Sequence, residues 1–208
     1  MKAKIAVIGN GSWSSALVKI LTDNGHTIRW WMRSTSAIEH LAKTQHNLHY
    51  LTMVKYPIQQ LQLSNNLEES IQESDIILMG IPSAFIVSTL SELPKGIFEG
   101  KKILSAIKGI LPEQNGLLNE YLAKQFQVPL MNYICIAGPC HAEEIAAEKL
   151  SYLTFASDNM EAANTIASYF TNTYLQTVVS NDVFGVQYED EKKNIYALGA
   201  GIAHGLDY

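Results

Sequence analysis

Two glycines near the start of the chain, Gly9 and Gly11, follow the β-branched apolar run 4–8 and precede a helical pattern. Gly9 permits a tight turn, and Gly11 lets the backbone approach a pyrophosphate, which the free N–H groups of the next helix attract. Ser14 stands where a third glycine or an alanine is usual in this motif. The order of strand, Gly-x-Gly and helix therefore predicts a dinucleotide-binding turn, and a glycine-rich turn without a ligand is the alternative.

The choice of dinucleotide depends on the end of the second predicted strand, where the chain reads Trp31, Met32, Arg33, Ser34. NAD sites usually place a carboxylate there, about twenty residues after the glycines, to hold the ribose 2′-hydroxyl. Arg33 stands there instead, and its planar guanidinium can pair with a 2′-phosphate. NADP(H) is therefore preferred over NAD(H), and a solvated arginine at a strand end is the alternative.

Three further segments follow predicted strands, and the carboxyl ends of strands are where open α/β sheets bind ligands. They are residues 80–83, 105–109 and 137–144. Each segment alone is an ordinary turn, but their convergence on one edge favours a site. Trp30 and Trp31 must lie on opposite faces of their strand, so we expect one in the core and the other beside an adenine. We expect Tyr50 to be a packing residue.

Apolar runs of strand length alternate with helical patterns along the chain. Strands are predicted at 4–8, 27–32, 75–80, 102–106, 133–137, 152–156 and 175–179. Helices are predicted at 13–23, 37–43, 67–72, 83–90, 113–126, 141–148, 160–170 and 185–205, with an irregular segment at 44–61. This alternation predicts parallel pairing with right-handed crossovers, hence an α/β fold with a Rossmann-type, doubly wound, mostly parallel sheet.

The chain changes character near Val183, where a helix with many small residues begins. Small residues let another helix approach closely, so this helix predicts a partner that the remaining residues do not supply. We therefore divide the chain into a dinucleotide-binding domain, residues 1–182, and the first helix of a truncated all-α domain, residues 183–208.

Composition narrows the class of protein. The net charge is −5 and there is no basic block, which argues against nucleic acid as a partner. The apolar runs are too short to span a bilayer, and the start lacks a signal-peptide pattern. The two cysteines, Cys135 and Cys140, suit a reducing cytoplasm and give no metal site. We expect a cytoplasmic enzyme that acts on a small molecule. A homodimer is one of the oligomeric states that the sequence leaves open.

Four motifs in order resemble those of the bacterial NAD(P)-dependent glycerol-3-phosphate dehydrogenases. The run 9–17 is similar to the family's Gly-x-Gly-x-Trp-Gly-Thr-Ala-Leu, with Ser14 and Ser15 in place of its glycine and threonine. The others are Lys108-Gly109, the Gly-Pro-x-x-Ala-x-Glu run at 138–144, and a helix with Gly185-Val186 and Lys193-Asn194. The resemblance covers nearly the whole chain.

The resemblance implies a role for each matching residue. The cofactor would contact Ser12, Trp13, Arg33, Lys108 and Ala142, in addition to the turn at Gly9 and Gly11. The substrate, dihydroxyacetone phosphate or glycerol 3-phosphate, would contact Lys108, Gly138, Cys140, Lys193 and Asn194. Cys140 stands where many relatives carry serine or threonine.

Lys193 matches the family's catalytic lysine. A protonated amine aimed at the ketone oxygen stabilises the negative charge left by hydride transfer and then donates a proton. A lysine titrates near pH 10.4, so burial and a neighbouring cation such as Lys108 would have to lower its pKa. The carboxylates of Glu189, Asp190 and Glu191 would oppose that change. Lys192 lies about 100° around the helix from Lys193 and so faces elsewhere.

The resemblance implies an oxidoreductase that transfers a hydride between NAD(P)H and dihydroxyacetone phosphate and thereby supplies glycerophospholipid synthesis. Two alternatives stay open. One is a dehydrogenase of another small hydroxy acid, and the other is a non-catalytic or truncated NADP-binding module.

Overall fold

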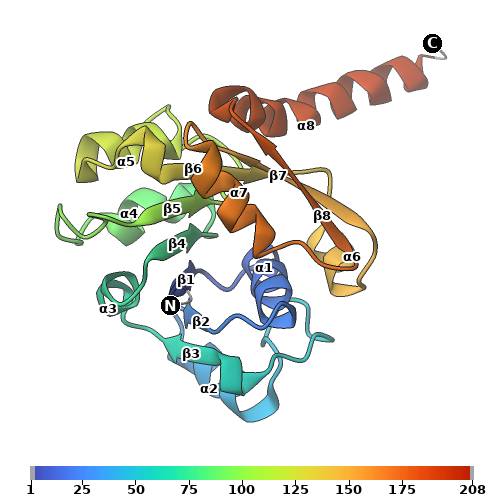
Figure 1. Ribbon diagram of the computed structural model, residues 1–208. Coiled ribbons are helices and arrows are strands. Elements are labelled where there is room, and N and C mark those ends of the chain that lie inside the picture. Colours follow the sequence, from blue (N-terminus) through green and yellow to red (C-terminus); the bar gives the residue numbers. More distant parts are fainter. Residues whose placement is uncertain (1–2, 207–208) are drawn as a thin grey trace.

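A computed structural model describes residues 3–206 of the chain, without the side chains of residues 189–194. Its centre is an eight-stranded sheet with the strand order β3-β2-β1-β4-β5-β6-β7-β8 (Figure 1). The strands are β1 (Ile5–Ile8), β2 (Ile28–Trp31), β3 (Leu61–Ser64), β4 (Ile76–Met79), β5 (Lys102–Ser105), β6 (Tyr133–Ala137), β7 (Ser151–Ala156) and β8 (Leu175–Ser180). The first six run parallel. The predicted doubly wound, mostly parallel sheet is confirmed.

Helices cover both faces of this sheet. They are α1 (Ser12–Asp23), α2 (Thr35–Thr44), α3 (Leu67–Gln72), α4 (Ile86–Leu90), α5 (Leu118–Phe126), α6 (Ala142–Ala146), α7 (Met160–Ser168) and α8 (Val183–Gly205). Short 3₁₀ turns occupy Ile58–Gln60, Ser83–Phe85 and Leu130–Asn132. Among the described helices, none is both long enough and apolar enough to cross a bilayer.

The core forms two layers because successive side chains of a strand point to opposite faces. In β1, Ile5 and Val7 pack on the side of α1, α6 and α7, whereas Ala6 and Ile8 pack on the side of α3, α4 and α5. All four residues are buried, which explains why the strand is a continuous apolar run rather than an alternating one.

Three features of the fold differ from the sequence-based prediction. The edge strand β3 was absent from it, since only the short alternation Leu61-Gln62-Leu63-Ser64 marks the strand and Pro57 lies just before it. Helix α5 begins at Leu118, five residues after the predicted start at Glu113. Strand β7 pairs antiparallel with β6, although parallel pairing was expected.

The direction of β7 follows from the place where the connection before it leaves the chain. Residues 138–150 contain only the 5-residue helix α6, which packs in the core layer of α1. Ala137, the last residue of β6, pairs with Thr154, so β7 begins beyond the carboxyl end of β6 and runs back beside it.

The strand order reverses between β1 and β4. From β1 the chain adds β2 and β3 on one side, and then returns to add β4, β5 and β6 on the other. The connections on the two sides of this point leave a crevice at the carboxyl ends of the strands, the usual ligand site of a doubly wound sheet.

Candidate functional site

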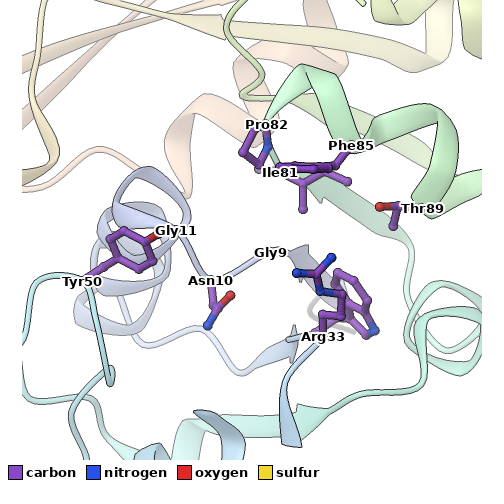
Figure 2. A pocket seen from close by; sticks show the side chains of 11 residues that line it. Gly9, Asn10, Gly11, Arg33, Tyr50, Ile81, Pro82, Phe85 and Thr89 are labelled. Carbon is purple, nitrogen blue, oxygen red and sulfur yellow. The ribbon is translucent and has the colours of Figure 1, made fainter. Parts of the chain in front are cut away.

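A pocket of about 220 Å³ lies at this reversal point. Figure 2 shows Arg33 and Tyr50 on opposite sides of it, with Gly9 and Asn10 between them and Ile81, Pro82 and Phe85 above. Its lining comes from the end of β2, the segments that follow β1, β2 and β4, helix α4 and the segment after α2: Gly9, Asn10, Gly11, Trp31, Arg33, Tyr50, Gly80, Ile81, Pro82, Phe85 and Thr89.

Residues 9–12, called the glycine turn below, lead from β1 into α1. Gly9 has a φ of +113°, and a Cβ there would lie 2.8 Å from Ile81 Cγ2, so the fold itself requires glycine. Gly11 is different, because its φ is −67° and a Cβ would meet nothing within 4 Å. The open side of Gly11 leaves room for a ligand to approach the backbone.

Helix α1 presents its N-terminus to the pocket. Gly11 is the N-cap residue and has no side chain to occupy the first N–H groups. The first turn, which contains Ser12 and Trp13, has no acidic residue that would compete with an anionic ligand. The positive end of the helix dipole and these N–H groups can therefore act on a phosphate.

Arg33 follows β2 and is exposed at the pocket. In the described part of the chain, no carboxylate forms an ion pair with it. Ser34 next to it is the N-cap of α2, and its hydroxyl accepts a hydrogen bond of 3.3 Å from the N–H of Ala37. Arg33 is thus the side chain at this strand end that can hold a 2′-phosphate.

The tryptophan pair divides as the strand geometry predicts. Trp30 is fully buried, and its Nε1 donates to the carbonyl oxygen of Gly9 at 2.7 Å. Trp31 lies on the other face and lines the pocket, with its Nε1 donating to the carbonyl oxygen of Asn65 at 3.0 Å. One indole supports the glycine turn from behind and the other forms a wall of the pocket.

Lys108 lies in the exposed segment that follows β5. Its Nζ is 5.4 Å from the centre of the Trp13 ring, within the range of a cation–π contact. The structure thus brings together two predicted cofactor residues that are far apart in the sequence. An ammonium at this place adds positive charge near the N-terminus of α1.

The turn after β6 contains three predicted site residues. A Cβ at Gly138 would overlap the carbonyl oxygen of Tyr152, so close packing on β7 accounts for this glycine without a ligand. Cys140 and Ala142 are 4% and 6% exposed and belong to the apolar core. Their contacts with substrate and cofactor stay predictions.

Lys193 and Asn194 lie within α8, and their side chains are outside the described residues. Two hydrogen bonds hold the start of this helix, one with its cap and one with β6. Asp182 accepts a hydrogen bond of 2.8 Å from the N–H of Gly185, and the hydroxyl of Tyr133 donates to Gln187 Oε1 at 2.9 Å. Burial raises the pKa of Tyr133 well above its usual value, so this hydroxyl keeps its proton.

Sequence reasoning missed residues of the irregular segment 44–61. Tyr50 was expected to be a packing residue, which is wrong, because it is 44% exposed and lines the pocket. Asn47 was overlooked although it is 2% exposed and hydrogen-bonds to the glycine turn. The only sequence signal for Asn47 is a polar residue in a stretch without periodicity, and that signal is common in loops.

Comparisons with known proteins agree with these features. The family described as NAD-dependent glycerol-3-phosphate dehydrogenase N-terminus matches residues 4–163. The chain is 34% identical over 212 residues to a glycerol-3-phosphate dehydrogenase [NAD(P)+] of Lactiplantibacillus plantarum, with 100% of this chain and 62% of that protein covered. A Streptococcus sanguinis protein of the same name is 31% identical, again over 100% of this chain and 61% of that protein.

Among solved structures, glycerol-3-phosphate dehydrogenase from Coxiella burnetii matches with a TM-score of 0.85 and 27% identity, covering 99% of this chain and 62% of that one. The structure of the Plasmodium falciparum enzyme, at 22% identity and a TM-score of 0.86, supports the fold alone. The chain thus spans 61–62% of the length of the bacterial relatives named above.

Proposed function

The chain belongs to the NAD-dependent glycerol-3-phosphate dehydrogenase family, and from this premise we propose that it binds a nicotinamide dinucleotide for the interconversion of dihydroxyacetone phosphate and sn-glycerol 3-phosphate. The product would supply glycerophospholipid synthesis in the cytoplasm. Since the relatives named glycerol-3-phosphate dehydrogenase [NAD(P)+] are longer than this chain, their activity is extended to it as a proposal.

The observation that carries the proposal is the open side of Gly11 at the N-terminus of α1. The backbone conformation of Gly9 and its contact with Ile81 require glycine even without a ligand, whereas Gly11 faces empty space in the pocket. A pyrophosphate fits there, because it would meet backbone N–H groups, the helix dipole and no carboxylate of the first helical turn. This fit supports a dinucleotide rather than an uncharged ligand.

We propose NADP(H) as the preferred cofactor, with NAD(H) as the alternative. Arg33 stands at the end of β2, where the ribose 2′ position lies in dinucleotide sites of this architecture. Its guanidinium can form two hydrogen bonds with a 2′-phosphate, while the 2′-hydroxyl of NAD offers no charge to pair with.

We assign the proton transfer to Lys193. Gly9, Gly11, Ser12, Trp13, Arg33, Lys108 and Ala142 would hold the nicotinamide dinucleotide, whose reduced form would supply the hydride for the carbonyl carbon of dihydroxyacetone phosphate. Lys193 would give a proton from Nζ to the ketone oxygen, so that the C=O group becomes CH–OH, with its C–O single bond kept, and the lysine is left neutral. In the reverse direction the neutral amine accepts the proton. Lys108, Gly138, Cys140 and Asn194 would hold the substrate.

We place the domain division, 1–182 and 183–208, at the start of the long helix α8, whose N-cap is Asp182. Figure 1 shows α8 starting beside the sheet and running outward from it. The catalytic lysine would then come from the helical part and the cofactor from the sheet part, with the substrate between them.

A parallel titration with NADPH and NADH, followed by the change in tryptophan fluorescence, tests the cofactor assignment. Trp13 and Trp31 lie beside the glycine turn and in the pocket wall, so either ligand should change their emission. We expect saturable binding of both and tighter binding of NADPH. Saturation by neither ligand would overturn the proposal for this chain.

A further inference from the structure

Two successive peptide groups of the glycine turn are held by buried side-chain donors. Trp30 Nε1 donates to the carbonyl oxygen of Gly9 at 2.7 Å. Asn47 Nδ2 donates to the next carbonyl oxygen, that of Asn10, at 3.0 Å. One donor comes from β2 and the other from the segment after α2, so elements distant in the chain converge on the same turn.

Because a peptide group is planar, a contact that holds its C=O also fixes the direction in which its N–H points. In a trans peptide, the C=O of one residue and the N–H of the next point to opposite sides. Since Asn47 holds the C=O of Asn10, the N–H of Gly11 points away from Asn47. Gly11 lines the pocket, whereas Asn47 is 2% exposed and lies outside the lining. Among described residues, no protein group accepts a hydrogen bond from this N–H.

Asn47 is itself fixed by its remaining hydrogen bonds. Its Nδ2 also donates to Ser15 Oγ at 2.8 Å. Its Oδ1 accepts from the N–H of His49 at 3.0 Å and from that of Tyr50 at 3.3 Å. An asparagine side chain has two donors and two acceptor positions, and all are used here. A buried, fully bonded amide holds the Asn10 peptide far more firmly than solvent would.

We infer that Asn47 is a positioning residue for dinucleotide binding, which presets the Gly11 N–H toward the pyrophosphate without touching the ligand. This inference rests on the proposed function. An N–H that is already aligned needs no reorientation when the phosphate arrives, which favours affinity. The role concerns the pyrophosphate alone, because Arg33 and the pocket wall act on the adenosine end.

The test compares Asn47→Ala with the wild-type chain for NADPH, NADH and adenosine 2′-monophosphate, which has no pyrophosphate. We expect NADPH and NADH to bind about tenfold more weakly, by the same factor, as the loss of one aligned hydrogen bond to a charged group predicts. Adenosine 2′-monophosphate should bind as to the wild type. An equal loss for all three ligands, or no loss for any, would overturn the inference.

Tyr56→Phe is the matched control. The Tyr56 hydroxyl donates to the carbonyl oxygen of Ser15 at 3.1 Å, so this variant also removes a buried hydrogen bond between the same segment and α1. It leaves the Asn10 peptide untouched, and its affinities should stay at the wild-type values. If Asn47→Ala does not fold, Asn47→Ser replaces it, since serine can keep the local turn but cannot reach Asn10.

The same experiment separates this inference from the proposed function. A wild-type chain that binds neither NADPH nor NADH would contradict the proposed function. A wild-type chain that binds both, with an Asn47→Ala variant that binds them equally well, would contradict only the role of Asn47.

Discussion

Ser14 Oγ donates a hydrogen bond of 2.6 Å to the carbonyl oxygen of Gly80, which joins the first turn of α1 to the end of β4. Ser14 occupies the position at which a third glycine usually allows the helix to pack closely on the sheet. Here the close approach of helix and sheet depends on a glycine of the facing segment instead, because a Cβ at Gly80 would overlap the Ser14 hydroxyl. Ser14 and Gly80 together thus make the close contact that a third glycine in the motif usually allows.

This pair predicts non-additive mutations. Gly80→Ala should lower the free energy of unfolding by about 2 kcal/mol, as overpacking of a buried contact does. In a Ser14→Gly background the same substitution should cost less, because the overlapping hydroxyl is gone. Chemical denaturation of the four proteins in this double-mutant cycle measures the difference. Equal costs in both backgrounds would show that the two positions do not interact.

Gly11→Ala separates folding from ligand binding. A Cβ at Gly11 meets nothing within 4 Å and the backbone is unstrained, so we expect stability to change by less than about 1 kcal/mol. The methyl group would occupy the space of the pyrophosphate, so binding of NADPH and NADH should both weaken at least about tenfold. A thermal melt and the fluorescence titration check the two halves. Unchanged affinity would mean that the ligand does not approach Gly11.

Much of this site could be predicted because the signals are local. Gly9 and Gly11 follow a continuous apolar strand, and Arg33 follows the next strand at the expected distance, so their meeting at one sheet edge follows from parallel pairing. The positions of β1, β2, β4 and β5 were predicted for the same reason, since strands buried on both faces leave long apolar runs.

The parts that were missed depend on contacts between distant residues. Asn47 reaches an atom 37 residues away, and nothing in its neighbourhood distinguishes it from a solvated loop asparagine. Tyr50 lies in the same segment, and its N–H donates to Asn47 Oδ1 at 3.3 Å. The edge strand β3 is half exposed, so it lacks the apolar run that marked the central strands.

Arg33→Gln should change cofactor preference rather than binding in general. Loss of a charge-assisted pair with the 2′-phosphate should weaken NADPH binding about tenfold or more and leave NADH nearly unchanged. Arg29→Gln is a matched control, since Arg29 lies in β2, just before Arg33 in the chain, but borders a different cavity, with Lys4 and Glu73. A ratio of the two dissociation constants that does not move in Arg33→Gln would rule out the 2′-phosphate contact.

Lys193→Ala should abolish turnover and spare cofactor binding, because the amine is proposed to act on the ketone oxygen alone. We expect kcat to fall at least about a thousandfold, within or above the range for loss of a general acid. Steady-state rates and an NADPH titration on the same preparation give both readouts. Lys192→Ala is the control, since Lys192 lies about 100° around an ideal helix from Lys193. Turnover that survives in Lys193→Ala would assign the proton to another group.

A cluster of charged and polar side chains around the buried Lys19 joins α1 to the segments before β7 and β8, and its two carboxylates are exposed. Lys19 Nζ donates to Asp23 Oδ2 at 2.6 Å and to Glu148 Oε1 at 3.0 Å, and the Tyr174 hydroxyl donates to the same Asp23 oxygen at 2.6 Å. Burial opposes the charge on Lys19, but its bonds to the two carboxylates outweigh that effect and raise its pKa. Burial and the bond to Asp23 raise the pKa of Tyr174 from 10.0 to about 12.

Both shifts predict a loss of stability at alkaline pH. In the folded state Lys19 and Tyr174 keep protons that the unfolded chain releases above about pH 10, so the unfolded state is favoured as the pH rises. Their contribution is complete below the unfolded pKa values and declines as the pH passes toward the folded ones. Tyr174→Phe should therefore lose less stability than the wild type, by about 1 kcal/mol, between about pH 8 and about pH 11. Urea unfolding at the two pH values measures this, with Tyr152→Phe as the exposed control. Equal losses in Tyr174→Phe and wild type would mean that Tyr174 does not couple folding to proton release.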